Sequence, residues 1–315
     1  MVRGEMGLAQ MTGPRVILAG GSGFLGTALA GELVAGGYQV INLSRSPRNP
    51  SGSVTELPWD GRTVGEWAGA LDGAVAVVNL TGRSVDCRYT AANRRAIIES
   101  RVDSVRAIGI AINECSQPPP VWIQAASLAV YGDAGDLICE EHAPIGEGFS
   151  VDVCQRWEAA VDQQVTPHTR KTILRIGFVL GPGGGALSKL ARLARYGLGG
   201  TVGSGRQYIS WLHIDDLNRI FRWAIEREDI FGTYNATGPN PVPNATFMRE
   251  LRRSLGVPIG PPTPAFLVRV GSFLMSTEAS LALTGRRCVP TRLTKQGFTF
   301  SYPVLKDALR NLLQR

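Results

Sequence analysis

The strongest constraint on the fold lies near the start of the sequence, in a glycine-rich turn between an apolar run and a helical pattern. Residues 15–19 read "RVILA", a short apolar run of the strand type, and apolar residues recur at helical spacing in residues 27–35. Three glycines lie between the two: Gly20, Gly23 and Gly26. In that order they suit a tight turn, a close approach of backbone to a pyrophosphate, and close helix–strand packing. Because an apolar strand pattern resumes at residues 38–44, the stretch predicts a dinucleotide-binding βαβ unit.

The same alternation of strand and helix patterns continues along the chain. Apolar runs follow at residues 74–80, 121–127 and 171–181, and residues 91–115 carry a long helical pattern. Strands separated by helices in this rhythm predict an α/β protein with a Rossmann-type, doubly wound parallel sheet.

The composition of the sequence changes after residue 180, where glycine-rich segments typical of loops replace the apolar runs typical of strands. We therefore predict a smaller C-terminal α+β substrate lobe beside the NADP-binding domain. The expected divisions are a flexible tail at 1–14, a Rossmann domain at 15–180 to which 213–235 returns, and a lobe built from 181–212 and 236–315. Within the lobe, a helical pattern begins at Asn244, a predicted N-cap, and stops just before Gly256.

Composition limits the expected partners. The formal net charge is +7, but the basic residues are spread in short groups with no run of five, so no nucleic-acid partner is expected. The most apolar later segment, residues 265–275, is interrupted by Arg269 and Gly271 and is too short to span a bilayer, so no membrane partner is expected. Nothing in the sequence predicts the oligomeric state.

Cysteine and histidine usage points to a cytoplasmic protein without a metal. Five cysteines with no close pair predict reduced thiols. The three histidines show no metal-ligand spacing with each other or with cysteine. Residues 1–14 lack the apolar core of a secretory signal.

The end of the second predicted strand indicates which dinucleotide binds. NAD sites usually place Asp or Glu there, where the carboxylate accepts hydrogen bonds from the ribose hydroxyls. Here the strand ends in "NLSRSP", so Ser44 can donate to a 2′-phosphate and Arg45 can clamp it or stack on adenine. These residues favour NADP(H) over NAD. The alternative left open is that Arg45 is an ordinary exposed loop charge.

Several motifs along the chain resemble those of a known superfamily. "GGSGFLG", "NLTG", "VYG", "LRIGFVLGPGGG" and "WLHIDD" resemble the extended short-chain dehydrogenases, which include the nucleotide-sugar epimerases. More narrowly, "GSGRQYISWLHIDDL", "YNATGPNPVPNATF" and "RRCVPTRLTKQGFTFSYPVLKDAL" are similar to the SDR39U1-type epimerase family. The resemblance runs from about residue 15 to the C-terminus.

The resemblance implies an NADP(H)-binding Rossmann domain with a C-terminal lobe that closes over a small-molecule substrate of unknown identity. It places cofactor contacts in the glycine loop, at two strand ends, in the helix motif "ESRV" and in "GFVLG". The implied residues are Gly20, Gly21, Ser22, Gly23, Phe24, Leu25, Gly26, Ser44, Arg45, Leu80, Thr81, Gly82, Arg101 and Val179. For Arg101, an ordinary helix-surface arginine stays an open alternative.

The resemblance also raises a difficulty for catalysis. Extended short-chain dehydrogenases use a Tyr and a Lys four residues later, on the helix after a Ser-bearing strand. "VWIQAAS" matches that strand, with Ser127 as the candidate hydrogen-bonding residue. On the helical pattern at 149–161, alignment through Glu158 puts the Tyr position at Ser150 and the Lys position at Cys154. A shift by one residue does not restore the pair.

Other residues are candidates for the missing chemistry. Tyr131 in "VYG" lies just beyond the Ser-bearing strand and is the candidate proton donor, with packing or substrate contact as the alternative. Cys154 is a candidate nucleophile, although a cysteine on an apolar helix face is more often core. His213 is a candidate acid or base, while Asp215 or Asp216 is predicted to be the N-cap of the helix that follows.

Arginines in the second half of the chain are candidates for substrate binding. In nucleotide-sugar enzymes, arginines of this lobe bind the substrate's phosphates in a bidentate manner, which suggests such a role for Arg175 and Arg206. Arg206 lies in a glycine-rich loop with Trp211, which together form a predicted substrate lid; loop anchoring is the alternative.

Two functions therefore remain open at the level of sequence. One is an NADP(H)-dependent oxidoreductase or epimerase acting on a small polar or nucleotide-linked substrate. The other is a non-catalytic NADP(H)-dependent sensor or protein-binding module, which the missing Tyr–Lys pair favours.

Overall fold

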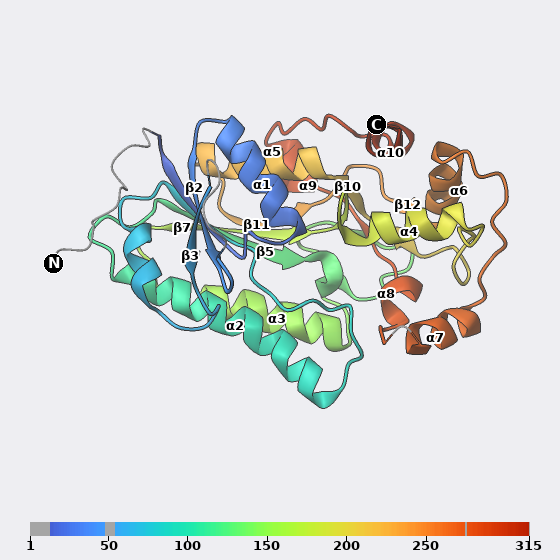
Figure 1. The fold of residues 1–315 in the computed structure, drawn as a ribbon, viewed down its shortest axis with the longest axis horizontal. Coiled ribbons are helices and arrows are strands. Elements are labelled where there is room, and N and C mark those ends of the chain that lie inside the picture. The colour runs from blue at the N-terminus through green and yellow to red at the C-terminus, as the bar shows by residue number, and fades with distance from the viewer. Residues whose placement is uncertain (1–12, 48–53, 275, 315) are drawn as a thin grey trace.

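The structure is a computed structural model, and it describes residues 13–47, 54–274 and 276–314. The predicted tail at residues 1–14 falls almost entirely outside these ranges. Figure 1 shows a sheet flanked by helices on both faces, with a group of further helices at the right-hand end.

The elements alternate as the sequence predicts in the first two thirds of the chain. The helices are α1 (Phe24–Ala35), α2 (Ala91–Asn113), α3 (Phe149–Asp162), α4 (Gly185–Arg195), α5 (Ile214–Glu226), α6 (Asn244–Ser254), α7 (Ala265–Leu274), α8 (Ser280–Leu283), α9 (Thr291–Lys295) and α10 (Leu305–Leu313), with 3₁₀ turns η1 (Glu66–Leu71) and η2 (Leu128–Tyr131). The strands are β1 (Arg15–Ala19), β2 (Gln39–Ser44), β3 (Val54–Pro58), β4 (Ala76–Asn79), β5 (Val121–Ser127), β6 (Ile138–Cys139), β7 (Arg170–Ile176), β8 (Phe178–Leu180), β9 (Tyr208–Ile209), β10 (Trp211–His213), β11 (Gly232–Ala236), β12 (Val242–Pro243) and β13 (Arg287–Cys288).

Seven parallel strands form the main sheet in the order β11-β7-β5-β4-β1-β2-β3. The chain proceeds outward from β1 in both directions, so the order reverses between β1 and β4. This doubly wound sheet confirms the predicted fold class. A reversal of this kind opens a crevice at the carboxyl ends of the strands, where ligands of open α/β sheets bind.

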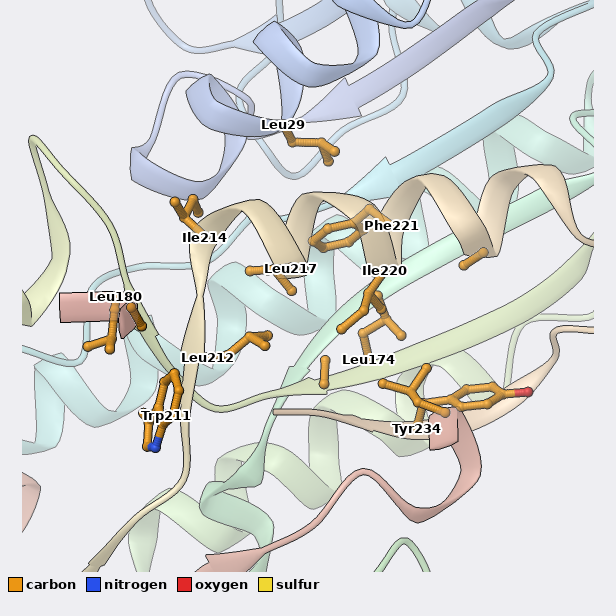
Figure 2. Packing of buried hydrophobic residues seen from close by; sticks show 14 of the residues in the cluster. Leu29, Leu174, Leu180, Trp211, Leu212, Ile214, Leu217, Ile220, Phe221 and Tyr234 are labelled. Atoms are coloured by element: carbon orange, nitrogen blue, oxygen red, sulfur yellow. The ribbon is translucent and has the colours of Figure 1, made fainter. Parts of the chain in front are cut away.

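Each face of the sheet is covered by helices that bury one apolar side. Helices α1 and α5 cover one face, and Figure 2 shows Leu29 of α1 above Ile214, Leu217 and Phe221 of α5, with Leu174 of β7 beneath. Helices α2 and α3 cover the other face, where their apolar residues pack with those of the sheet. The sheet is therefore buried on both sides, which explains why its strands are nearly continuous apolar runs.

The predicted strand at 171–181 is two strands in the structure. A Cβ at Gly177 would lie 2.5 Å from the carbonyl oxygen of Ser210, so only glycine allows the chain to pass this close to its neighbour. After this point β8 leaves the main sheet and pairs with β10. The break carries the chain from the Rossmann sheet toward the second lobe.

Two predicted helix caps are wrong. Helix α6 begins at Asn244 with Pro243 as its N-cap, because the Asn244 side chain accepts a hydrogen bond from the Val202 amide (2.9 Å) instead. The N-cap of α5 is His213, whose Nδ1 accepts from the Asp215 amide (3.1 Å). Gly256 does follow the end of α6, in the left-handed region at φ +68°, as predicted.

Candidate functional site

Three glycines of the turn between β1 and α1, Gly20, Gly21 and Gly26, have no room for a side chain, whereas a Cβ on Gly23 would meet its nearest neighbour at 3.8 Å. Gly20 has φ +79°, and a Cβ there would lie 3.1 Å from the backbone of Thr81. A Cβ on Gly21 would lie 2.4 Å from Oδ1 of Asn42, and one on Gly26 would lie 2.4 Å from Cα of Gly21. The loop thus holds the first turn of α1 against the crevice, and the amides at a helix start of this kind can bind an anionic group.

The end of β4 is supported by buried amide side chains. Oδ1 of Asn79 accepts from the Thr81 amide (3.0 Å), and its Nδ2 donates to Ser104 (3.2 Å) and Gln124 (3.1 Å). Sequence reasoning missed Asn79 and Gln124. A fully buried asparagine at the end of an apolar strand is the signal that identifies them, because such a group needs partners.

The hydroxyl of Thr81 lies beneath the glycine loop, just after β4. Its Oγ1 is buried and has no hydrogen-bond partner among the described residues. It lies beside Gly20, on the side where a Cβ of that glycine would stand 3.1 Å away. A buried, unpaired hydroxyl is costly unless a ligand completes it.

The end of β2 places Ser44 and Arg45 at the same edge of the sheet as the glycine loop. Ser44 is buried and its Oγ accepts from the Ser46 amide (3.3 Å), while Arg45 is exposed. No carboxylate stands in the "NLSRSP" turn. The arrangement is compatible with a 2′-phosphate, and the contacts of both residues with a cofactor stay predictions.

Arg101 of α2 reaches toward the end of β4 and is partly buried. Its Nη1 donates to the carbonyls of Ile97 (2.9 Å) and Arg83 (3.0 Å), and its guanidinium lies 4.9 Å from the ring centroid of Trp157. A Cβ on Gly82 would be 3.1 Å from this guanidinium. Burial lowers the pKa of Arg101 from its usual value. The side chain therefore lies at the predicted cofactor edge and is held against the protein.

Of three further predicted site residues, Ser127 and Leu80 lie along the same edge, whereas Val179 lies on β8, outside the main sheet. Ser127 ends β5, is partly buried, and its Oγ accepts from the Ala129 amide (3.2 Å). Leu80 follows β4, and Val179 of β8 is paired with Leu212. Ser127 is thus close to where the crevice opens, but its hydroxyl already caps the η2 turn.

Helix α3 contains neither tyrosine nor lysine, and Phe149 and Cys154, at or beside the aligned positions, are held by packing. Phe149 packs edge-on against Tyr89, with ring centroids 4.7 Å apart, and the Arg94 guanidinium lies 4.7 Å from its ring centroid. Cys154 is buried, and burial together with Glu158 raises the pKa of its thiol to about 12. A thiol in this setting stays protonated at neutral pH, which argues against a nucleophile.

Tyr131 belongs to a buried polar network between the sheet and the second lobe. Its hydroxyl donates to Oδ1 of Asn235 (2.8 Å) and accepts from Nη1 of Arg175 (2.9 Å). Arg175 in turn forms a bidentate pair with Glu158, at 2.8 and 2.7 Å. Burial raises the pKa of Tyr131 to about 12. These contacts favour a structural role for Tyr131 and Arg175, and the catalytic role of Tyr131 stays a prediction.

The predicted substrate lid is not assembled as expected. Trp211 is fully buried in β10, where its Nε1 donates to the Asn240 carbonyl (2.8 Å), so it packs in the core. Arg206 is highly exposed, and Nη2 lies 3.7 Å from Oδ2 of Asp136. His213 is fully buried and stacks on Tyr302 at 3.9 Å. Of these three side chains, only that of Arg206 is exposed, and its contact with a substrate stays a prediction.

A hollow of about 620 Å³ adjoins the outer side of the glycine loop. Ser22, Gly23 and Phe24 line it on one side, and Pro182 with Gly183 on another. It does not reach Ser44 or Thr81, and its remaining lining comes from α1, the start of α5 and Leu312 of α10, so it lies between these helices and not at the β2 and β4 edge of the crevice. Among the described residues, no group of three or more His, Cys, Asp or Glu side chains could hold a metal.

Comparison with known proteins identifies the family. A family model described as the NAD dependent epimerase/dehydratase family matches residues 16–236, most of the chain. The chain belongs to this family. A second model, described as a domain of unknown function (DUF1731), matches residues 263–312.

Members of the epimerase family align with nearly the whole chain. The epimerase family protein SDR39U1 of Bos taurus is 33% identical over 304 residues, covering 95% of this chain and 99% of its own length. Epimerase family protein YfhF of Bacillus subtilis is 30% identical over 302 residues, covering 95% and 97%. These alignments confirm the resemblance to SDR39U1-type epimerases.

Solved structures of the family share the fold. Human epimerase family protein SDR39U1 (isoform 2) with NADPH has a TM-score of 0.86 and 31% identity, covering 96% of this chain and 99% of that chain. A nucleoside-diphosphate sugar epimerase from Corynebacterium glutamicum has a TM-score of 0.77 and 30% identity, covering 96% and 58%. The epimerase fold therefore includes both the Rossmann sheet and the C-terminal lobe.

Proposed function

We propose that this chain binds NADP(H) in the crevice at β1, β2 and β4 and uses it as an oxidoreductase or epimerase on a small polar or nucleotide-linked substrate. The observation that carries the proposal is the buried, unpaired hydroxyl of Thr81 beside the glycine loop. A dinucleotide laid over Gly20 supplies the polar partner that this hydroxyl lacks. The human relative that contains NADPH supports the choice of cofactor.

Different parts of the crevice would bind different parts of the cofactor. The glycine loop and the start of α1 would hold the pyrophosphate. Ser44 and Arg45 would hold the 2′-phosphate, and Arg101, beside Gly82, would offer its guanidinium to the ribose and nicotinamide end. The absence of a carboxylate after β2 favours NADP(H), since nothing there repels a phosphate.

Bound NADP(H) supplies a carbon that gives or takes a hydride. The chain's own contribution is to orient the substrate and handle a proton, and α3 provides neither a tyrosine nor a lysine for it. Ser127 is the hydroxyl best placed to hydrogen-bond a substrate oxygen, because it is partly exposed at the carboxyl end of β5. Arg206, exposed on the lobe, would meet an anionic group of the substrate.

A second candidate function is a non-catalytic NADP(H)-dependent module. It is favoured by the engagement of Tyr131: its hydroxyl is already shared between Asn235 and Arg175. Because α3 lacks the Tyr–Lys pair, such a protein would bind the cofactor and change its contact with a partner protein according to whether NADP(H) is oxidised or reduced.

The shared premise is tested by fluorescence titration with NADPH and NADH. The Arg45→Ala variant should bind NADPH about tenfold more weakly and NADH unchanged, because one charge-assisted contact to the 2′-phosphate is lost. Arg106→Ala, an exposed arginine of α2, is the matched control and should change neither. Equal affinities for both cofactors in wild type and Arg45→Ala would refute the assignment.

Turnover separates the two candidate functions. NADPH oxidation is followed against a panel of carbonyl compounds and nucleotide sugars, with wild type and Ser127→Ala side by side. Turnover that falls in Ser127→Ala at unchanged NADPH affinity supports the enzyme. Tight NADPH binding without turnover above background across the panel favours the non-catalytic module.

A further inference from the structure

The net charge of the chain is concentrated in two segments. Residues 185–206 and 244–274 contain eight Lys and Arg and one acidic residue, Glu250, so they carry the whole net charge of +7. The rest of the chain contains twenty-five basic and twenty-five acidic residues. The two segments comprise α4, α6, α7 and their connections, which Figure 1 shows gathered at the right-hand end of the molecule. We call this surface the basic end.

Backbone contacts join the two segments into one surface. Nη1 of Arg252 in α6 donates to the Gly199 carbonyl just after α4 (2.7 Å). The Thr263 amide donates to the Thr201 carbonyl (2.8 Å), and the Gly203 amide donates to the Thr263 carbonyl (2.9 Å). The end of α4 therefore runs directly beside the segment that leads into α7.

Helix α7 turns its apolar stripe toward solvent. None of its ten described residues is buried. Phe266, Phe273 and Leu274 are 61%, 64% and 76% exposed, and with Leu267 and Val270 they follow the spacing of one helix face. A stripe of this kind packs against the core in an ordinary surface helix. Here it is exposed, apart from the Arg88 guanidinium that lies 4.1 Å from the ring centroid of Phe273, and the exposed Arg269 lies at its border.

Further apolar side chains are exposed among the arginines of the same surface. Tyr196 and Leu198, which follow α4, and Ile259, which follows α6, are all exposed. Arg249, Arg252 and Arg253 line a shallow hollow of about 420 Å³ next to them. The one acidic side chain, Glu250, is already engaged by Arg249 and Arg253.

We propose that the basic end docks on the surface of an anionic lipid bilayer. Lysines and arginines near such a surface are attracted to acidic headgroups, and an amphipathic helix buries its apolar face at the boundary with the acyl chains. No helix of the described residues is long and apolar enough to cross a bilayer, so the attachment is peripheral.

Other occupants fit the surface less well. A second copy docked face to face would bring two positively charged ends together, since six of the eight basic residues remain after Lys189 pairs with Asp86 and Arg206 with Asp136. A nucleic acid would meet the arginines but leave the stripe of α7 uncovered. The prediction of no membrane partner rested on residues 265–275 being too short and too interrupted to span a bilayer, which leaves attachment to the bilayer surface open, and the basic residues are scattered along the sequence. The fold brings eight of them to one end.

Flotation of the full chain with phospholipid vesicles tests the proposal. The protein should float with vesicles of phosphatidylcholine and phosphatidylglycerol, stay behind with phosphatidylcholine alone, and be released by salt. Phe266→Ser with Phe273→Ser should lower vesicle partitioning at least tenfold, since each phenylalanine contributes buried apolar area. Arg192→Gln with Arg195→Gln should lower it about tenfold.

Phe231→Ser is the matched control, because Phe231 is 61% exposed but lies outside the basic end. It should float as wild type does, and thermal melting should show all variants folded. Binding that is absent with anionic vesicles, or that survives in the α7 variant, overturns the proposal. The proposal is also overturned if no flotation is seen and the α7 substitutions instead abolish a concentration-dependent dimer or RNA binding.

Discussion

At the scale of single residues, the crevice is shaped by polar side chains buried beneath it. Asn79 uses both ends of its amide, accepting from Thr81 and donating to Ser104 and Gln124. This holds the Thr81 backbone in place and leaves its hydroxyl unpaired. Such a hydroxyl destabilises the protein on its own and gains a partner when a ligand binds.

Thr81→Val is therefore expected to separate stability from binding. Valine fills the same space without a buried, unpaired hydroxyl, so the free energy of unfolding without cofactor should be unchanged or rise by up to about 1 kcal/mol. The rise in melting temperature on adding NADPH should shrink. Thr81→Ser, which keeps the hydroxyl, is the control and should show the full rise in melting temperature on adding NADPH. A variant that unfolds more easily yet binds NADPH normally would contradict this role.

Tyr131→Phe distinguishes a structural from a catalytic role for this tyrosine. Its hydroxyl lies between Asn235 and Arg175, at 2.8 and 2.9 Å, so its loss should lower the free energy of unfolding by about 1–3 kcal/mol. NADPH affinity should not change. The measurements are urea unfolding and fluorescence titration. A large loss of turnover with unchanged stability would instead support the proton-donor hypothesis.

Some of these residues could be found from the sequence and others could not. The glycine loop and the Ser44–Arg45 turn follow from spacing, because local backbone demands determine them. The sequence predicts Trp211 as a lid residue because it follows a glycine-rich loop, yet it is fully buried by segments distant in sequence. His213, and not a neighbouring aspartate, caps α5, since the Asp216 carboxylate accepts from the amides of Ser301 and Tyr302.

At the scale of elements, α1 contains two glycines, and only the one that faces the glycine loop is required for close packing. Gly26 faces the loop, where a Cβ would stand 2.4 Å from Cα of Gly21. Gly31 of the same helix is exposed, and a Cβ there would meet nothing within 4 Å. Both positions are glycines of the same helix, but one is tightly packed and the other is open to solvent.

Alanine at these two positions should have opposite effects. Gly26→Ala should lower the free energy of unfolding by about 1–3 kcal/mol and weaken NADPH binding, because the phosphate-facing loop must shift. Gly31→Ala should raise stability by about 0.5–1 kcal/mol through helix propensity and leave binding unchanged. Chemical unfolding and NADPH titration measure both. Equal effects at the two sites would rule out loop packing as the cause.

Most elements could be predicted because their apolar periodicity is strong. The core strands are buried on both faces, and α2 and α3 bury one side each. The edge strand β3 was missed, since its residues are only partly buried and leave a weak pattern. The division of β7 from β8 depends on the approach of Ser210 to Gly177, a contact between distant segments that no local pattern shows.

At the scale of the whole molecule, a loop of the Rossmann domain is hydrogen-bonded to the C-terminal lobe. Asp86 accepts hydrogen bonds from Lys189 of α4 and from Thr277, the latter at 2.5 Å. Nearby, Arg88 donates to the Phe273 carbonyl (2.6 Å), and the Tyr89 amide donates to Glu278 (2.6 Å). This loop, residues 86–89, follows closely after Thr81 and Gly82 in the sequence, so one short segment contacts the lobe and leads from the predicted cofactor edge.

Asp86→Asn should loosen the lobe without unfolding the protein. Hydrogen bonds from Lys189, and then Thr277, lower the pKa of Asp86, so its contribution is present above about pH 4 and lost as pH falls below that. The contacts are solvent-exposed, so the free energy of unfolding should fall by less than about 1 kcal/mol. Hydrogen exchange of residues 276–283 should nevertheless become faster. Asp307→Asn, which breaks a local pair with Arg310 on α10, is the control and should leave that exchange unchanged. Exchange that is equally slow in Asp86→Asn at neutral pH would show that the apolar contacts alone hold the lobe closed.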